Sequence, residues 1–433
     1  MSTAAQERLI RPARNIYGSL RLPGDKSISH RYAMLGAFAE GTSRFTNFST
    51  GADCASTLGC MEALGAKVNR LGNEAIEITG VGGRVRPSAQ PIDCGNSGST
   101  MRKMSGLLAA QQGRFTLIGD ESLSRRPMGR IQKPLEQMGA RLTLTEGHAP
   151  LTIEGGPLNS IDYTTPVPSA QVKTCVLLAG LQTEGTTTVR EAVRTRDHSE
   201  LALRAFGATL TRTIDSISIS GPQSLHAIEA AVPGDLSSAA FFLCAAAIFP
   251  GSGLVLDSIG LNPTRAALLD VLTTLGAHIS VLNLEEKHAE LVGTVQVTGP
   301  AEGLGSTAIT GALSAQLIDE LPVLAAIGPY TSGGIRIRDA KELRVKESDR
   351  IALVAKNLRA MGAEVIEFED GLDVPGGQTL HGATIDSGSD HRIAMAFSVA
   401  GLRAEGDTLI QGAESAAISF PEFFDLLDRV AER

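Results

Sequence analysis

Basic side chains stand at the predicted start of several helices in this sequence. In three segments, a glycine-, serine- or aspartate-rich stretch precedes an apolar, helix-forming pattern: GDKSISHRYAMLGAF (24–38), GNSGSTMRKMSGLLAA (95–110) and SDHRIAMAFSVAGL (389–402). The cations near these starts are Lys26, Arg31, Arg102 and Arg392. A helix start carries free backbone N–H groups and partial positive charge, which disfavour a cation but suit a phosphate. We therefore expect these starts to bind a small polyanion; for any one of them, the alternative is a capped helix with solvated charges.

An arginine-rich loop adds to these cations. In SLSRRPMGRI, residues 122–131, Arg125, Arg126 and Arg130 surround a proline turn. Paired arginines favour bidentate contacts with phosphate or carboxylate groups. The loop therefore strengthens the expectation of an anionic ligand.

One charged segment is a candidate for proton transfer. The segment ELRVKESDRIALVAKNLRAMGA (342–363) predicts a helix on which Lys346 and Arg350 share a face. Glu347 lies three residues before Arg350 and is placed to move a proton beside these cations. A surface ladder of Lys, Glu and Arg is the alternative interpretation.

Two further carboxylates interrupt an apolar stretch. Asp319 and Glu320 lie in LSAQLIDELPVLAAIG. Burial of an unpaired carboxylate is costly, so such a residue is often functional or paired with a cation. We therefore expect Asp319 and Glu320 to be functional, to pair with a cation, or both.

The composition limits the classes of protein that fit. The chain has 433 residues, 42% of them apolar, and a net charge of −8. This length predicts two domains, and an acidic chain with 4% aromatic residues is a poor candidate for nucleic-acid binding. The longest apolar run, 239–249, is too short to span a bilayer. The sequence has no nucleotide-binding or metal-binding motif of the common types.

The cysteines predict reduced thiols in a cytoplasmic protein. There are five, they are scattered, and none forms a CxxC pair. Cys94 is the best-placed candidate for a thiol nucleophile, but no partner base can be assigned to it.

A repeat extends through the chain. A helix-like stretch, a glycine and a short strand recur at intervals of 66 to 82 residues, around Gly41, Gly113, Gly185, Gly251, Gly333 and Gly406. A second pattern, a helix end with Gly-Ala followed by a strand, alternates with the first at 63–68, 137–142, 205–210, 274–279 and 360–365. Glycine just after the last turn is typical of a helix C-terminus. The sequence therefore predicts six similar α/β units, three in each of two domains.

The sixth unit lacks its last strand, and this sets the expected domain limits. The N-terminal stretch NIYGSLRLPG (15–24) is a candidate for that strand. The expected limits are one domain of residues 24–234 and one of residues 1–23 plus 235–433, with hinge crossings near 23–24 and 233–235. The two crossing segments, LPGDKSIS and VPGDLSSA, also resemble each other.

With these motifs, the chain resembles the 5-enolpyruvylshikimate-3-phosphate synthase family over essentially its whole length. The matching motifs are LPGDKSISHR, GNSGSTMR, RRPMGR, PSAQVK, TRDHSE, IDELPVLA, ELRVKESDR, DHRIAMAF and SFPEF, in this order. GDKSISHR and RVKESDR are highly specific, and SAQVK, TRDH and SFPEF are shared with the glyphosate-tolerant bacterial branch. The resemblance implies an α/β fold of two similar domains, each with three βαβαββ units in an inverse α/β barrel, and an active site in the interdomain cleft.

The resemblance also implies an activity. The family transfers the enolpyruvyl group of phosphoenolpyruvate to the 5-hydroxyl of shikimate 3-phosphate and releases phosphate, by addition and elimination through a tetrahedral intermediate. The step belongs to the shikimate pathway of chorismate and aromatic amino-acid biosynthesis. The resemblance implies no cofactor, no metal, and no nucleic acid or membrane as a partner. We expect a cytoplasmic monomer that takes the two small-molecule substrates, with glyphosate as an inhibitor.

Roles for individual residues follow from the matching motifs. The residues implied for shikimate 3-phosphate are Lys26, Ser27, Arg31, Ser169, Ala170, Gln171, Arg196, Asp319 and Lys346. Those implied for phosphoenolpyruvate are Lys26, Asn96, Gly98, Arg126, Glu347, Arg350 and Arg392. Asp319 would accept the proton of the attacking hydroxyl, while Glu347 and Lys26 would move protons at the methylene carbon and at the intermediate.

Two positions depart from the family pattern. Many relatives carry a lysine where this chain has Ile418, so one contact to phosphoenolpyruvate is in doubt. The glyphosate-tolerant branch has alanine at the position of Gly98, where its methyl group crowds the inhibitor. Because this chain has glycine there, we expect glyphosate to fit.

Three other functions remain as alternatives. The nearest is UDP-N-acetylglucosamine enolpyruvyl transferase, which shares the fold but uses a loop cysteine before an Arg-Pro pair; the matching loop here, SLSRRPM, has none. An RNA 3′-phosphate cyclase would need a nucleotide site and a basic surface. A scaffold of packed repeats without enzymatic activity would leave the cations and Asp319 unexplained.

Overall fold

The chain forms two compact units, each with its own hydrophobic core. A computed structural model describes residues 7–433 except 73–74. The N-unit comprises residues 24–232 together with 287–290. The C-unit comprises the chain up to Pro23, 233–286 and 291–433. Residues 1–6 of the predicted second domain lie outside the described residues.

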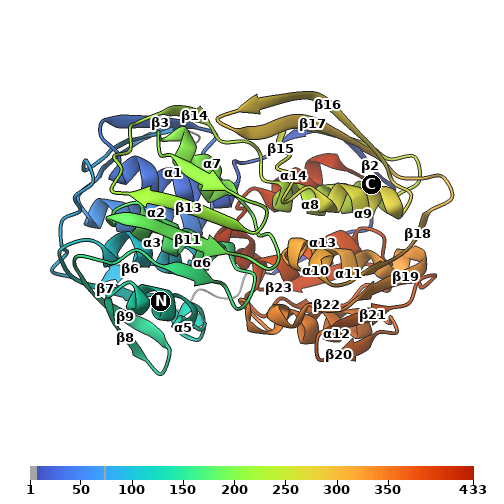
Figure 1. Ribbon diagram of the computed structural model, residues 1–433. Coiled ribbons are helices and arrows are strands. Elements are labelled where there is room, and N and C mark those ends of the chain that lie inside the picture. Colours follow the sequence, from blue (N-terminus) through green and yellow to red (C-terminus); the bar gives the residue numbers. More distant parts are fainter. Residues whose placement is uncertain (1–6, 73–74) are drawn as a thin grey trace. The chain divides into compact units, whose positions relative to one another are not determined.

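The N-unit consists of three similar repeats of strands and helices (Figure 1). The first contains β14 (Glu229–Ala231), α1 (Lys26–Phe38), β3 (Thr42–Thr46), α2 (Ala52–Ala63), β4 (Lys67–Leu71) and β5 (Ala75–Thr79). The second contains β6 (Ile92–Asp93), α3 (Gly98–Ala109), β7 (Gly113–Ile118), α4 (Glu121–Ser124), α5 (Gly129–Gln137), β8 (Arg141–Thr145) and β9 (His148–Gly155). The third contains β10 (Asp162–Thr164), α6 (Ala170–Gly180), β11 (Gly185–Arg190), α7 (His198–Ala205), β12 (Leu210–Arg212) and β13 (Ser216–Gly221).

Each of these repeats forms one four-stranded sheet with the same topology. The orders are β14-β3-β5-β4, β6-β7-β9-β8 and β10-β11-β13-β12. In each sheet the first two strands are parallel and the others antiparallel. A parallel pair needs a crossover connection, which α3 and α6 supply in the second and third repeats. This is the βαβαββ order that the resemblance implied, and the predicted fold class is confirmed.

The C-unit follows the same plan with an incomplete last repeat. The fourth repeat contains β2 (Asn15–Arg21), α8 (Leu236–Ala247), β15 (Gly253–Gly260), α9 (Ala267–Thr274), β16 (His278–Lys287) and β17 (Glu290–Thr298). The fifth contains β18 (Leu304–Ile309), α10 (Ala312–Gln316), α11 (Leu321–Ile327), the 3-10 helices η1 (Gly328–Tyr330) and η2 (Lys341–Val345), β19 (Thr331–Ile337), α12 (Arg350–Ala360), β20 (Ile366–Phe368) and β21 (Gly371–Val374). The sixth contains β22 (Thr384–Asp386), α13 (His391–Gly401), β23 (Thr408–Gln411), the 3-10 helix η3 (Ala413–Ile418) and α14 (Phe423–Val430), with β1 (Arg8–Ile10) at its sheet edge. The last strand, β24 (Ala431–Glu432), pairs with β2 in the sheet of the fourth repeat.

One predicted strand pairing is wrong. The stretch 15–24 was expected to complete the sixth repeat, but β2 pairs in parallel with β15 and opens the fourth repeat. The short strand β1 pairs with β23 of the sixth repeat instead. The sequence pattern of β2 fits a strand in either sheet, and the parallel position beside β15 is the one that the crossover helix α8 requires.

The predicted helix ends are confirmed at all five Gly-Ala positions. Their glycines, at 65, 139, 207, 276 and 362, have φ between 89° and 103°. This left-handed conformation is costly for a residue with a Cβ, so glycine is the residue that ends these helices.

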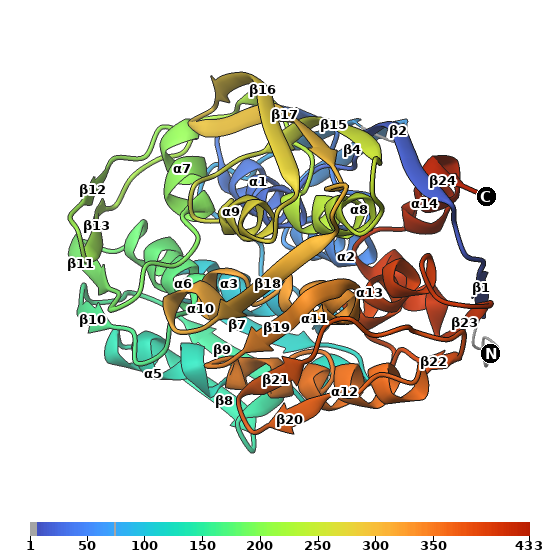
Figure 2. The same cartoon turned by 90° about the vertical axis from the view of Figure 1, so that its right-hand side faces the viewer.

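Helices α3 and α6 pack against each other at very short range in the N-unit (Figure 2). They run in parallel, because Ser99 contacts Gln171 near the starts and the backbone of Leu107 contacts Gln182 near the ends. At the middle of α3, a Cβ added to Gly106 would lie 1.9 Å from the Cys175 carbonyl oxygen. The absence of a side chain at this position therefore sets the distance between the two helices.

Within the described residues, no helix is long and apolar enough to cross a bilayer.

We predict that Gly106→Ala destabilises the chain by about 3 kcal/mol or more, because the new methyl group meets a backbone atom that has no rotamer to change. The matched control is Gly59→Ala in α2, where a Cβ would have no heavy atom within 4 Å. That change should stabilise the helix by roughly 0.5–1 kcal/mol. Thermal unfolding of both variants tests this; equal melting temperatures for Gly106→Ala and wild type would contradict the packing argument.

Candidate active site

The start of α1 holds a cation beside a buried carboxylate. Asp25 caps the helix, with its Oδ1 accepting from the Ile28 backbone N–H at 2.8 Å. Lys26 follows as the first helical residue, and its Nζ donates to Asp53 Oδ2 at 3.1 Å. A lysine at a helix start is disfavoured by the helix dipole, and Asp53 offsets this in the N-unit. Sequence reasoning did not identify Asp53, since nothing in its local pattern distinguishes it.

Arg31 lies one turn further along α1 and is buried, with 4% of its surface exposed. Its Nε donates to Ser199 Oγ at 2.7 Å and one terminal nitrogen donates to the Ser27 carbonyl oxygen at 2.7 Å. The other terminal nitrogen donates to Thr174 Oγ1 at 3.3 Å. Burial lowers the pKa of Arg31 to about 10, so its guanidinium remains charged at neutral pH. These three hydrogen-bond partners are uncharged, so they fix the guanidinium group in place without neutralising its charge.

The start of α6 places two predicted residues beside α3. Ser169 caps the helix, with its Oγ accepting from the Val172 N–H at 3.3 Å, and Ala170 is the first helical residue. Gln171 donates to Ser99 Oγ at 3.0 Å and accepts from Arg102 at 2.8 Å. The amide of Gln171 is therefore held between two side chains of α3.

A buried ion triad positions the loop that carries Arg196. Lys173, with a fully buried side chain, lies 2.9 Å from Glu191 and 2.8 Å from Glu200. Glu191 also accepts from the Thr195 hydroxyl, one residue before Arg196. The charge of Arg196 contributes to lowering the pKa of Arg31, after the larger effect of burial. The motif PSAQVK contains Lys173. The role of Lys173 in positioning this loop depends on Glu191 and Glu200, which are distant from the motif in sequence.

The start of α3 carries the predicted phosphoenolpyruvate residues of the N-unit. Asn96 accepts from Arg126 at 2.6 Å and donates to Asp120 at 2.7 Å. A Cβ added to Gly98, the first residue of α3, would lie 3.5 Å from a terminal nitrogen of Arg126. These contacts show that three of the predicted residues lie close to one another: Asn96, Gly98 and Arg126. Of the other loop arginines, Arg125 does not join them: its side chain is 74% exposed and pairs with Glu121.

In the C-unit, one carboxylate is surrounded by three cations. Asp319 lies between α10 and α11, and its side chain is 17% exposed. Its Oδ1 is 3.7 Å from Lys346 Nζ and 3.7 Å from Arg350, and its Oδ2 is 3.8 Å from Arg392. Arg392 also donates to the Asp319 carbonyl oxygen at 2.7 Å. The neighbouring Glu320 is different: it is buried and accepts from the Ser237 hydroxyl in α8.

Arg350 is held by a second carboxylate that sequence reasoning did not assign to the site. Asp390, fully buried, accepts from Arg350 Nε at 2.8 Å and from a terminal nitrogen at 3.2 Å, while Glu347 accepts at 2.6 Å. Burial alone would lower the pKa of Arg350, but Asp390 and Glu347 raise it above its ordinary value. Burial would raise the pKa of Asp390, and Arg350 overcomes this and lowers it. Asp390 also caps α13 by accepting from the Arg392 N–H at 2.9 Å, so one residue orients two of the three cations.

The predicted single helix over 342–363 is wrong. Residues Lys341–Val345 form η2, and α12 begins at Arg350. Asp349 causes this break, because its side chain accepts from the Ala352 N–H at 3.0 Å and caps the helix. Lys346 and Glu347 therefore lie outside a helix, and they reach Asp319 and Arg350 from a loop.

Cys94 is not placed as a nucleophile. All five cysteines are free and buried. The pKa of Cys94 is raised, first by its contact with Cys60 and then by burial, which keeps the thiol protonated.

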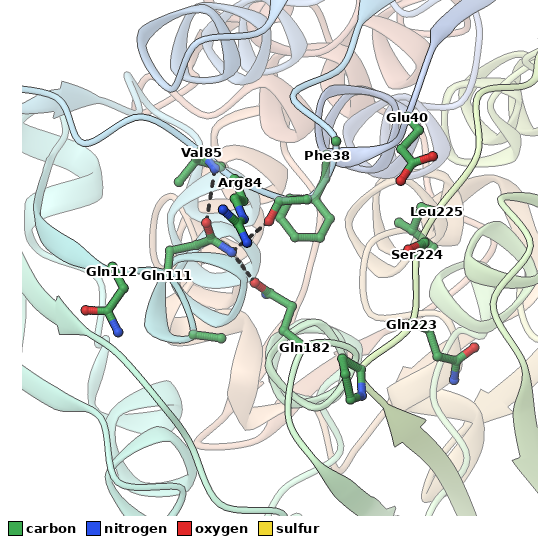
Figure 3. Close-up of a pocket in the computed structure, with 14 residues that line it drawn as sticks. Phe38, Glu40, Arg84, Val85, Gln111, Gln112, Gln182, Gln223, Ser224 and Leu225 are labelled. Carbon is green, nitrogen blue, oxygen red and sulfur yellow. Dashed lines mark hydrogen bonds between the residues drawn. The ribbon is translucent and has the colours of Figure 1, made fainter.

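A cavity of about 690 Å³ lies at the other end of the N-unit helices and contains none of the predicted site residues (Figure 3). Phe38, Gln111 and Gln182 line it, at or just after the ends of α1, α3 and α6. Figure 3 shows Gln111 bonded to Gln182 and to the backbone of Val85. Helix ends expose carbonyl groups with partial negative charge, so this cavity is a poor place for a polyanion.

The predicted site residues thus form one cluster in each unit. Lys26, Ser27, Arg31, Asn96, Gly98, Arg126, Ser169, Ala170, Gln171 and Arg196 belong to the N-unit; Asp319, Lys346, Glu347, Arg350 and Arg392 belong to the C-unit. Ile418, at the end of η3, is half-buried. The repeat-built α/β units and their two cation-rich clusters define a protein of the enolpyruvyl transferase-like fold.

Comparison with known proteins identifies the family. The model of the family described as EPSP synthase (3-phosphoshikimate 1-carboxyvinyltransferase) matches residues 10–427. The 3-phosphoshikimate 1-carboxyvinyltransferase of Koribacter versatilis (strain Ellin345) is 64% identical over 98% of this chain and 99% of its own, and that of Solibacter usitatus (strain Ellin6076) is 54% identical over 98% and 100%. The solved EPSP synthase of Acinetobacter baumannii superposes with a TM-score of 0.87, at 40% identity over 99% of this chain and 98% of that chain. The chain belongs to the EPSP synthase family.

We predict that Asp390→Asn destabilises the chain by about 3–5 kcal/mol at neutral pH, because it leaves Arg350 buried without its main counter-charge. The folded-state pKa of Asp390 is lowered, so its stabilising effect is present above the unfolded pKa and is lost as pH falls through the folded value. The difference from wild type should therefore shrink below about pH 4. Urea unfolding at several pH values measures this.

The control is Asp386→Asn, which breaks an ion pair with Lys356 in which both side chains are largely exposed. Its cost should stay below about 1 kcal/mol. A similar loss for both variants would show that burial of the Asp390 pair is not the cause.

Proposed function

We propose that the two clusters together carry out the EPSP synthase reaction, with each residue in the role that its motif implies. The chain is a 3-phosphoshikimate 1-carboxyvinyltransferase of the shikimate pathway. It transfers the enolpyruvyl group of phosphoenolpyruvate to the 5-hydroxyl of shikimate 3-phosphate and releases phosphate.

Shikimate 3-phosphate is proposed to bind to the helix starts of the N-unit. Ser169 at the start of α6 and the amide of Gln171 would receive its phosphate and ring, where backbone N–H groups favour an anion. Arg31 and Arg196 supply charge, and Ser27 and Lys26 complete the set at α1. The fixed partners of Arg31 and Gln171 support this, since donors held in advance lose little entropy on binding.

Phosphoenolpyruvate is proposed to bind to Arg126, Arg350 and Arg392, with Asn96, Gly98 and Lys26 close to it. A substrate with a phosphate and a carboxylate suits guanidinium groups, which bind both groups with paired hydrogen bonds. Asp390 orients Arg350 and the start of α13, which supports a role for these cations in substrate binding.

Asp319 is proposed as the base of the addition step. It would take the proton of the 5-hydroxyl as the oxygen attacks C2 of phosphoenolpyruvate, with Lys346 holding that hydroxyl. C3 becomes a methyl group by gaining a proton, from Lys26 or Glu347. In the elimination step C3 gives up a proton and the C2–O bond to phosphate breaks, which restores the double bond. The three cations within 3.8 Å of Asp319 stabilise its ionised form, and this observation carries the assignment.

We predict that Asp319→Asn lowers kcat by about 10²–10⁴ because general-base catalysis is lost. The assay measures phosphate release from phosphoenolpyruvate with and without shikimate 3-phosphate. Arg125→Gln, at an exposed loop position next to Arg126, is the control and should keep normal turnover. Normal turnover of Asp319→Asn would refute its role, whereas no shikimate-dependent release from the folded wild type would refute the whole proposal.

The same assay tests the nearest alternative. UDP-N-acetylglucosamine replaces shikimate 3-phosphate, and we expect no release of phosphate, because the loop containing Arg126 has no cysteine.

We further propose that the enzyme acts as a monomer in the cytoplasm. Both clusters are parts of one chain, and five free thiols suit a reducing compartment.

We also propose that glyphosate inhibits this enzyme, although several motifs match the glyphosate-tolerant branch. Gly98 leaves open the space next to Arg126 that an alanine methyl group would occupy at 3.5 Å from its guanidinium. That methyl group would also approach Arg102 to 3.2 Å, a flexible side-chain end that can shift.

We predict that Gly98→Ala raises the inhibitory concentration of glyphosate by at least about tenfold, which corresponds to about 1.4 kcal/mol. The KM of phosphoenolpyruvate should rise less than this. Inhibition assays on wild type and variant measure both quantities. Wild type that is unaffected by millimolar glyphosate would overturn the proposal.

A further inference from the structure

Two buried hydroxyl groups connect Arg31 in α1 to the start of α6. The Nε of Arg31 donates to Ser199 Oγ at 2.7 Å, and one terminal nitrogen donates to Thr174 Oγ1 at 3.3 Å. The two hydroxyl oxygens are 2.5 Å apart. Ser199 belongs to α7 and Thr174 to α6, and each is 2% exposed. Together they hold the guanidinium group in the paired manner in which a carboxylate holds it, but they carry no negative charge.

The hydroxyl hydrogens of this pair have one arrangement in which each has an acceptor. Thr174 Oγ1 lies 2.6 Å from the Ala170 carbonyl oxygen, one turn earlier in α6, and donates to it. Since Thr174 has a single hydroxyl hydrogen, the hydrogen between the two hydroxyl oxygens comes from Ser199. The series of hydrogen bonds thus runs from Arg31 through both hydroxyls to Ala170, the first residue of α6. The position of the guanidinium group is thereby coupled to this helix start.

Arg31 keeps part of its donor set for a ligand. A guanidinium group has five N–H donors. In the part of the chain that the structure describes, three of them are used, by the two hydroxyls and by the Ser27 carbonyl oxygen. The other two are on the terminal nitrogens, one on each, and paired N–H groups of this kind bind phosphate or carboxylate groups. Arg31 is therefore held in place while two donors and its positive charge remain for an anion.

We propose that Ser199 and Thr174 are positioning residues for shikimate 3-phosphate, because they fix Arg31 relative to the start of α6 so that both bind the same substrate molecule. A carboxylate in place of either hydroxyl would offset the charge that the substrate needs. An apolar side chain would leave a buried N–H group of Arg31 without an acceptor and let the guanidinium group turn, which costs entropy on binding. The inference rests on the proposed binding of shikimate 3-phosphate by Arg31 and the start of α6.

The experiment is titration calorimetry of shikimate 3-phosphate into wild type, Ser199→Ala and Thr174→Val. Valine keeps the shape of threonine but lacks the hydroxyl group. Each variant should bind with a roughly tenfold or more higher dissociation constant, because each loses a hydrogen bond to a charged group. The kcat and the KM of phosphoenolpyruvate should change less than about threefold, since the loss concerns binding of the other substrate. Thr174→Ser should recover most of the affinity; its failure to do so would assign the effect to packing and overturn the inference.

Two other buried hydroxyls of the N-unit provide matched controls. Thr183, just after α6, donates to the Ala179 carbonyl oxygen at 2.8 Å and is also 2% exposed. Ser105 in α3 donates to the Met101 carbonyl oxygen at 2.7 Å and is fully buried. Thr183→Val and Ser105→Ala should bind shikimate 3-phosphate as wild type does. A similar loss of affinity in these controls would show a general effect of removing buried hydroxyls and would contradict the positioning role.

A double-mutant cycle with Arg31→Lys separates positioning from a structural role. A lysine side chain cannot make the paired contact, so adding Ser199→Ala or Thr174→Val to it should cost little further affinity. Additive losses would overturn the inference, and so would unchanged affinity of the two folded single variants. If these two bind normally while Arg31→Lys binds weakly, the proposed function stands and the failure concerns the hydroxyls alone. If Arg31→Lys also binds normally, the proposed binding of the substrate by Arg31 is wrong, and the inference falls with it.

Discussion

The unsatisfied backbone N–H groups at helix starts are the constraint on which the rest of this structure depends. In the N-unit, α1, α3 and α6 begin after Asp25, Ser97 and Ser169, whose side chains satisfy one N–H group of each helix. The remaining N–H groups need a partner that is water or an anion. Helices α3 and α6 run in parallel at close range, so their starts lie together and their partial charges add. A pair of anionic substrates is suited to such a place.

Buried ion pairs hold segments of the chain in place in both units. Lys173 connects α6 to the loop before α7 through Glu191 and to α7 itself through Glu200, and Arg350 connects α12 to the start of α13 through Asp390. In both cases opposite charges pair inside the protein, and their effect is to fix segments that carry candidate ligand-binding residues.

Glycine has two separate structural uses in this chain. At the Gly-Ala positions, a left-handed φ ends the helix and lets the chain turn into a strand. At Gly106 the backbone conformation is ordinary helix, and the missing side chain allows Cys175 to approach. The first use can be recognised from local sequence, because the glycine follows a helix pattern and precedes a strand. The second depends on a neighbour 69 residues away and cannot be recognised that way.

Much of the fold was predictable because its signals are local and repeated. Helix ends, strand alternation and the spacing of about 70 residues are each visible in short windows, and their agreement across the chain predicted the repeated α/β units. The errors arose where two local signals competed. Asp349 can lie within a helix or cap one, and the structure uses it as a cap, which divides the segment 342–363. The strand β2 fits either of two similar sheets, and crossover connectivity places it in the fourth repeat.

The sequence by itself determined the repeat, the helix ends, the anionic character of the ligand and, through its motifs, the family. The tertiary structure decided which partner each charge has. It placed Asp319 beside Lys346, Arg350 and Arg392, paired Arg350 with Asp390, and left Arg125 exposed. The physical reason is that Coulomb interactions and desolvation depend on distance and burial in three dimensions. Residues that are adjacent in the chain, such as Arg125 and Arg126 or Asp319 and Glu320, can therefore have different roles.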